Sequence, residues 1–140
     1  LNGHGGNTAA ITNALHVLRD DHDITAYAVN WWSLAMDKIK EAATPPVYHA
    51  CDMETSVAWY LDQRVLAEKR VDEPGKSPVP GYVVADMLSG PPTAQMATMM
   101  KQLTDTGNVG YSTQATREKG KAIADVVIER LTELIRRLTA

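Results

Sequence analysis

The feature that most constrains this chain is a glycine-rich segment at its front, Asn2-Gly3-His4-Gly5-Gly6-Asn7. Three glycines around one histidine let the backbone turn tightly and approach a bound group closely. Apolar residues at spacings of four and three follow, which predicts a helix from Thr8 to Arg19 with Asn7 or Thr8 as its cap. No Walker phosphate loop or dinucleotide fingerprint is present. We expect His4 at the mouth of a loop and suited to a metal, although a simple turn with an incidental histidine fits the same residues.

Composition describes an ordinary folded domain. The chain has 140 residues, 44% of them hydrophobic, and a net charge of -3 with scattered basic residues. These values predict one domain with a real core and argue against a nucleic-acid partner. No apolar run approaches the roughly 20 residues that cross a bilayer, so we expect no membrane contact. The single cysteine, Cys51, excludes an internal disulfide and fits a cytoplasmic location.

The next stretch predicts a βαβ unit. The run from Ile24 to Val29 is apolar and rich in strand-forming residues, and Leu1-Asn2 reads as the end of an earlier strand. We therefore expect a buried strand in a mostly parallel sheet, with the first helix as the crossover. Ligands gather where parallel strands end, so Trp31-Trp32 and the His4 loop should be neighbours. The two tryptophans fit a pocket wall and a packed core equally well.

A second chemistry-bearing segment is His49-Ala50-Cys51-Asp52-Met53-Glu54. The spacing of five between His49 and Glu54 differs from the four-residue spacing of the HExxH zinc signature. We expect His49 in a loop and Glu54 in the first turns of a helix that continues through Leu61 and Val65. Glu54 could equally be a favourable charge at a helix N-terminus.

The remaining elements are two helices and a long connection. A helix from Ser33 to Ala42 should stop before Pro45-Pro46. Residues 71–107 predict an irregular rim or interface segment. It contains a turn at Gly90-Pro91-Pro92, a short strand at Tyr82 to Val84 and a short helix around Met96, Met99 and Met100. The last helix should be capped by Ser112 or Thr113 and carries an apolar stripe of Ile123, Val127, Leu131, Leu134 and Leu138.

Three segments together resemble the creatininase (creatinine amidohydrolase) family. They are the glycine-rich segment around His4, the block His49-Ala50-Cys51-Asp52-Met53-Glu54-Thr55-Ser56, and Ala115-Thr116-Arg117-Glu118-Lys119-Gly120 at the start of the last helix. The resemblance implies an α/β fold, a three-layer αβα domain with a mostly parallel sheet. Residues 1–140 would form the C-terminal half of that domain.

The resemblance also implies an activity. The expected enzyme is a metal-dependent amidohydrolase that cleaves a C–N amide bond in a carboxamide, formamide, lactam or peptide-like substrate. A metal-bound hydroxide would be the nucleophile at a dinuclear zinc, manganese or iron centre. His4 and Glu54 match metal ligands, and His49 matches the residue that shuttles a proton to the leaving nitrogen. The substrate-binding residues would be Gly5, Gly6, Trp31 and Trp32.

The expected partner is a second chain. Two protein ligands are too few for a catalytic metal, and the family carries a further Glu, His and Asp on an earlier segment. The chain begins directly at Leu1 beside the site-like loop, so we expect a second chain to supply the N-terminal half and these ligands, with assembly into a higher oligomer. True creatininases have a glutamate at the position of Gly6, which makes creatinine doubtful as the small-molecule substrate. The alternative is a non-catalytic binding or assembly domain with an incomplete metal site.

Overall fold

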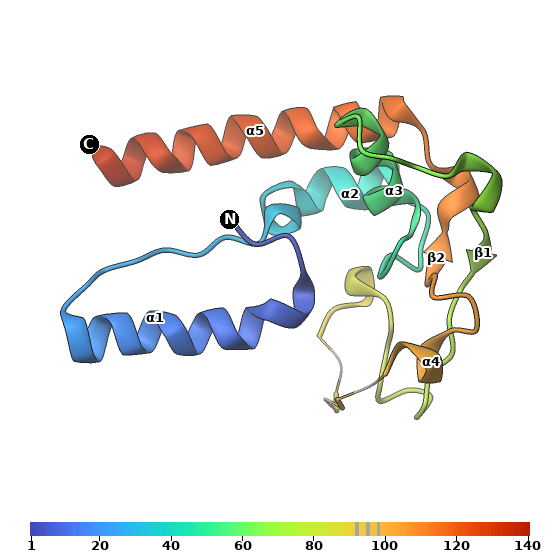
Figure 1. Cartoon of the computed structure of the whole chain (residues 1–140), viewed down its shortest axis with the longest axis horizontal. Helices are drawn as coiled ribbons and strands as arrows, with labels where there is room; N and C mark the ends of the chain where they lie inside the picture. Colours follow the sequence, from blue (N-terminus) through green and yellow to red (C-terminus); the bar gives the residue numbers. More distant parts are fainter. Residues whose placement is uncertain (92, 95, 98) are drawn as a thin grey trace. The chain divides into compact units, whose positions relative to one another are not determined.

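The computed structural model describes residues 1–140 except Pro92, Gln95 and Thr98 (Figure 1). The predicted turn at Gly90-Pro91-Pro92 and the predicted helix around Met96 therefore lie partly outside the described residues. Contacts divide the chain into two compact units. Unit 1 comprises residues 1–36 and 126–140, and unit 2 comprises residues 37–125. No helix of the described chain is long and apolar enough to cross a membrane.

In unit 1, helix α1 runs from Thr8 to His22, so it begins where predicted and continues past Arg19. The helix continues through the polar residues after Arg19. It ends where Asp23 adopts a left-handed conformation with φ of 53°. Basic residues in the last turn, Arg19 and His22, favour the negative end of the helix dipole. Asn7 occupies the N-cap position, as predicted, although its side chain makes no capping hydrogen bond.

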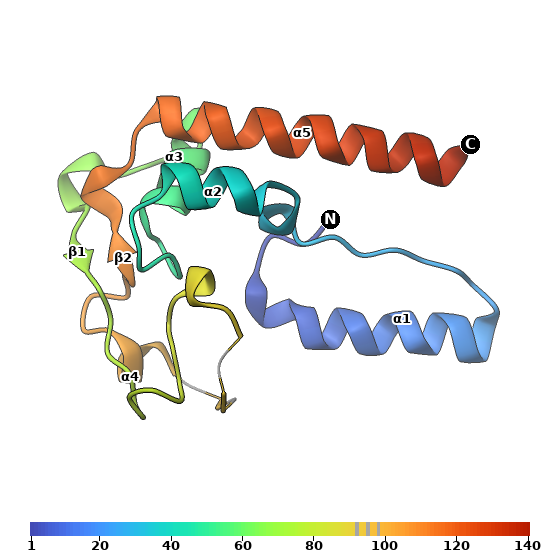
Figure 2. The ribbon, with the colours of Figure 1, turned by 180° about the vertical axis from the view of Figure 1, so that it is seen from behind.

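The predicted buried strand after α1 is extended but exposed. Ile24 is 49% and Tyr27 65% exposed. A single parallel bridge joins Asn2 to Asn30. The segments before and after α1 are therefore paired in parallel at one position, in the order predicted for a βαβ unit. Figures 1 and 2 show the segment running back from the end of α1 toward the start of the chain. No other strand of the described chain pairs with it, so a mostly parallel sheet is not confirmed.

Unit 2 contains most of the regular structure. Its elements are α2 (Met36–Ala42, whose first residue belongs to unit 1), α3 (Asp52–Tyr60), β1 (Asp72–Glu73), α4 (Met100–Leu103), β2 (Gly110–Tyr111) and the first part of α5 (Arg117–Thr139). Strands β1 and β2 pair antiparallel, with Asp72 opposite Tyr111 and Glu73 opposite Gly110. The largest fully buried apolar side chains all belong to this unit: Ile39, Val47, Val109 and Ile123.

Two of the helices in unit 2 differ from prediction at their starts. Helix α2 is preceded by a 3₁₀ turn, Trp31–Ala35, so Ser33 lies within that turn and does not cap the helix. Its end at Ala42, before Pro45-Pro46, is as predicted. Helix α4 begins at Met100 and leaves Met96 outside.

The strand predicted at Tyr82 to Val84 is wrong. The backbone turns there instead, because Gly81 has φ of 83° and both Tyr82 N and Val83 N donate to Val79 O, at 3.1 and 3.0 Å. The turn preference of the proline and glycine outweighs the strand preference of the β-branched residues that follow them. The sheet strands of this region lie at β1 and β2.

Helix α3 is shorter than its apolar pattern predicts. It ends at Tyr60, where Asp62 takes a left-handed conformation with φ of 56°. Gln63 N donates to Ala58 O and Asp62 N to Trp59 O, at 2.9 and 3.2 Å, which is the bonding of a Schellman motif. Leu61 is consequently 52% exposed and lies outside the helix.

Helix α5 begins later than predicted. Ser112 lies in the 3₁₀ turn Ser112–Gln114, and the cap is Thr116, whose Oγ1 accepts from Lys119 N at 3.1 Å. The apolar stripe is buried at Ile123 and Val127 and 42% exposed at Leu138.

Candidate functional site

The turn that carries His4 is held by a buried asparagine. Asn2 is 5% exposed, and its side chain donates to His4 O at 2.9 Å while accepting from His4 N at 3.1 Å. It also donates to Asn30 Oδ1 at 2.8 Å, which ties the turn to the bridge between the two chain segments. The prediction that this loop adjoins Trp31 is confirmed for the backbone, since Trp31 N donates to Asn2 O at 3.2 Å.

The His4 imidazole is available for binding. His4 is exposed, and neither ring nitrogen has a hydrogen-bond partner among the described residues. A Cβ placed on Gly6 would lie 2.8 Å from His4 Nε2, so the glycine leaves room for the ring, whereas Gly5 has open space around it. A side chain at Gly6 would therefore require the exposed His4 ring to shift.

Trp31 and Trp32 pack against each other. Their ring centroids lie 6.0 Å apart at 83°, in an edge-to-face arrangement. Both side chains are half-buried, so each ring keeps an exposed part. Both predicted roles, pocket wall and core, remain compatible with this arrangement.

His49 and Glu54 lie where the sequence predicts, before and within the first turn of α3. The His49 backbone is fixed by an antiparallel bridge to Val109, with hydrogen bonds of 2.8 and 3.2 Å. Glu54 Oε2 accepts from Ala50 N at 2.6 Å, in the short loop that turns through a left-handed Ala50 with φ of 48°. Glu54 thus stabilises the start of α3 with one oxygen, and Oε1 has no partner among the described residues.

Asp52 has a structural role that the sequence left open. Its carboxylate is fully buried, and Oδ2 accepts from Lys119 Nζ at 3.0 Å and Thr44 N at 2.9 Å. Oδ1 is buried without a donor in the described part of the chain. This ion pair joins the second motif to the third, because Lys119 belongs to the opening of α5.

The third motif packs its backbone directly against α3. Thr116 N donates to Ser56 Oγ at 3.0 Å, and a Cβ on Gly120 would lie 2.0 Å from Ser56 O. Only glycine permits this approach of α5 to α3. The motif therefore supports the start of α3, which carries Glu54.

Cys51 is not available as a ligand or nucleophile. Burial raises the pKa of its thiol to about 11, and its side chain is fully buried. The thiolate form that binds metals and attacks electrophiles is therefore negligible near neutral pH.

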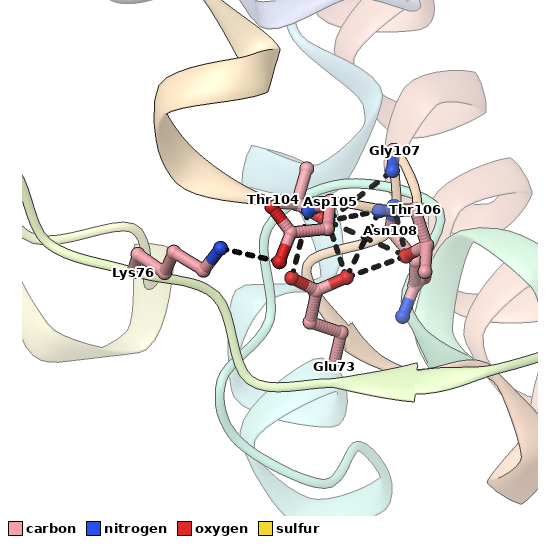
Figure 3. A network of polar contacts seen from close by, with 7 residues as sticks. All are labelled: Glu73, Lys76, Thr104, Asp105, Thr106, Gly107 and Asn108. Carbon is pink, nitrogen blue, oxygen red and sulfur yellow. Dashed lines mark hydrogen bonds and ion pairs between the residues drawn. The ribbon is translucent and has the colours of Figure 1, made fainter.

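A polar network around Glu73 holds the turn at residues 104–107 (Figure 3). The Glu73 carboxylate accepts from Thr104 Oγ1 at 2.7 Å, Asp105 N at 2.9 Å, and Thr106 N and Oγ1 at 3.1 and 2.6 Å. Lys76 pairs with Asp105 beside it. These hydrogen bonds, those from the Thr106 and Thr104 hydroxyls first, lower the pKa of Glu73 to about 2.

This network should make the free energy of unfolding depend on pH in the acidic range. Because the folded-state pKa lies below the ordinary 4.5, the stabilisation is complete above that pH and is lost as pH falls toward about 2. Glu73→Gln should therefore lower the urea midpoint at pH 6 and flatten its fall between pH 4.5 and 2. Glu68→Gln changes an exposed glutamate without a partner in the described chain and is the matched control. Identical acid profiles for the two variants would refute this role.

Comparison with known proteins identifies the family of this chain. A sequence model of the family described as creatinine amidohydrolase, or creatininase, matches residues 1–135. The chain belongs to the creatininase family. Neither a search of curated proteins nor one of solved structures found a match. Creatininase-family membership implies, at the general level, a metal-dependent amidohydrolase with an α/β fold.

The donor atoms present fit the divalent metal of the creatininase family. His4 offers an imidazole and Glu54 a carboxylate oxygen, each without a partner among the described residues, and the buried Cys51 thiol is excluded. Nitrogen and oxygen donors of this kind suit zinc, manganese or iron. The described residues contain no group of three or more His, Cys, Asp or Glu placed to hold a metal ion. His4 belongs to unit 1, and His49 and Glu54 belong to unit 2.

Some supporting residues escaped prediction from the sequence. Asn2 and Asn30 act through a contact distant in sequence, and Glu73 through a turn far along the chain. The Asn2-Gly3 pair was a usable turn signal, since asparagine side chains commonly bond the backbone of nearby residues. Nothing in the sequence around Glu73 indicates its partners.

Proposed function

We propose that this chain forms part of a metal-dependent hydrolase. The enzyme cleaves a C–N amide bond in a carboxamide, formamide, lactam or peptide-like substrate. The observation that carries the proposal is the combination of family membership with Glu54, which is held by Ala50 N through one oxygen and leaves the other without a partner in the described chain. An anchored carboxylate with one free oxygen is suited to a metal ligand, because its orientation is set before the metal binds.

In this proposal His4 and Glu54 are each a metal ligand, as the family resemblance implies, and the metal is zinc, manganese or iron in a dinuclear centre. When bound, such a metal lowers the pKa of a water and polarises the substrate carbonyl. The chain contributes orientation: Asn2 fixes the backbone on both sides of His4, and the bare Gly6 leaves space for its ring. A family glutamate is absent at Gly6, which supports a substrate other than creatinine.

His49 would move the proton that the reaction needs. As the C–N bond breaks, the leaving nitrogen takes a proton from His49, and the histidine regains it from the attacking water. The bridge to Val109 fixes the backbone of His49 three residues before α3, and its ring is unpartnered in the described chain. Trp31, Trp32, Gly5 and Gly6 would contact the substrate.

His49→Ala should separate turnover from metal binding. We expect the variant to retain its metal and to lose roughly 10²- to 10⁴-fold in kcat, as when a general acid or base is removed. The measurement is hydrolysis of a panel of formamides, lactams, primary carboxamides and short peptides, with metal content determined on the same samples. Loss of metal in His49→Ala would instead make it a ligand, and unchanged kcat would remove it from the reaction.

The remaining ligands, in this proposal, come from a second chain that supplies the N-terminal half of the domain, and the halves assemble into a higher oligomer. The support is the extended run from Ile24 to Val29, which is exposed as far as Ala28 and pairs with no strand in the described chain. Along α1, Ile11, Leu15 and Leu18 are only half-buried. An unpaired apolar strand edge favours pairing with another chain.

A further inference from the structure

An open surface cavity of about 470 Å³ lies beside Glu54 in unit 2. Its wall includes Thr55 of α3, the residues after that helix, and the turn that Glu73 holds (Figure 3). This volume is in the range of small-molecule sites. Thr106, Gly107 and Asn108 form one side of it, so the Glu73 network fixes that side.

Three cations line this cavity: Arg64, Lys69 and Arg70. Arg70 is fixed in the wall, with its guanidinium 4.9 Å from the Trp59 ring centroid and Nη1 donating to Ala115 O at 3.1 Å. Arg64 and Lys69 are exposed and have no hydrogen-bond or ion-pair partner among the described residues. The cavity therefore presents two uncommitted positive side chains and one anchored positive charge.

Most neutral polar groups of the wall are already hydrogen-bonded within the protein. Thr55 Oγ1 donates to Ala50 O, and Ser112 Oγ donates to Val71 O at 2.6 Å. Asn108 Nδ2 donates to Val71 O and Gly110 O, and its Oδ1 is buried without a donor in the described chain. The one carboxylate, Glu54, is the metal ligand of the proposed function. The exposed groups left to recognise a ligand are thus cationic donors.

We propose that this cavity binds an anionic group, a carboxylate or a phosphate, through Arg64 and Lys69, and so selects amide substrates that carry one. The selection of substrate rests on the proposed function, because Glu54 lines the same cavity. Guanidinium and ammonium groups bind both kinds of anion by charge-assisted hydrogen bonds. A substrate held by its anionic end would have its amide directed toward the side of Glu54.

Direct binding tests the anion site. Inorganic phosphate and succinate are titrated at constant ionic strength into the complete assembled protein. The wild type should bind at least one of them, and the Arg64→Gln/Lys69→Gln double variant should bind it more than tenfold more weakly. Lys101→Gln is the matched control, because Lys101 is exposed in the same unit and lies outside this cavity. The tighter of the two anions separates phosphate from carboxylate recognition. Absent binding, or equal affinity in all variants, overturns the site.

Kinetics test the substrate class. N-formylglycine and its neutral counterpart N-formylglycinamide share one formamide bond, and release of formate from that bond is measured for both. The double variant should raise KM for the acid more than tenfold and leave KM for the amide within twofold. An equal change for both substrates overturns the selection. If neither is hydrolysed and the protein holds no metal, the proposed function fails, and the titrations still decide whether the cavity binds anions.

Discussion

Gly120→Ala should destabilise the protein by about 3 kcal/mol, or roughly 10 °C in Tm, because the new methyl group meets backbone that cannot move aside. Its Cβ would lie 2.0 Å from Ser56 O and 2.8 Å from Tyr60 Cβ. In an exposed helix the same change would stabilise the protein by up to about 1 kcal/mol. The expected destabilisation therefore comes from the close packing of α5 on α3.

The measurement is thermal unfolding followed by circular dichroism, with Gly3→Ala as the control. Gly3 has no atom within 4 Å of its added Cβ. A Tm for Gly120→Ala equal to that of the control would show that α5 does not approach α3 as closely as described.

Asp52→Ala should cost about 3 kcal/mol, at the lower end of the range for breaking a buried ion pair, because the Lys119 side chain is 26% exposed. The variant leaves the Lys119 ammonium without its partner and Thr44 N without an acceptor. Because Asp52 begins α3, loss of the pair should also loosen the helix start that carries Glu54.

Asp125→Ala is the matched control, since it removes a Lys–Asp pair whose side chains are 60% and 49% exposed. Exposed pairs contribute about 0–1 kcal/mol. A double-mutant cycle with Lys119→Ala, measured by urea unfolding, isolates the coupling between Asp52 and Lys119. Equal midpoints for the Asp52 and Asp125 variants would contradict the structural role of the buried pair.

Local signals predicted that the helices exist and where some of them begin or end. The start of α1 at Thr8, the end of α2 before Pro45-Pro46, and the placement of His49 before Glu54 all follow from caps, breakers and spacing. These features depend on residues within a few positions of each other. The predicted helix ends are wrong where a single residue adopts a left-handed conformation, as Asp62 does after α3.

Non-local features could not be predicted in the same way. The burial expected for Ile24 to Val29 depends on neighbouring strands, and the described chain offers it only the bridge at Asn2. The Asp52–Lys119 pair and the Glu73 network join residues far apart in sequence. Their partners become visible only once the chain is folded, because spacing patterns describe a single element at a time.

Metal content tests the proposed hydrolase most directly, measured by inductively coupled plasma mass spectrometry on the chain purified in its assembled form. We expect near-stoichiometric zinc, manganese or iron in the wild type and in His16→Ala, and loss of metal in His4→Ala and Glu54→Gln. The chain purified alone should hold far less metal than the assembly. Full metal content in Glu54→Gln, or a well-folded wild-type assembly without metal, would contradict the proposed ligands and the proposed hydrolase.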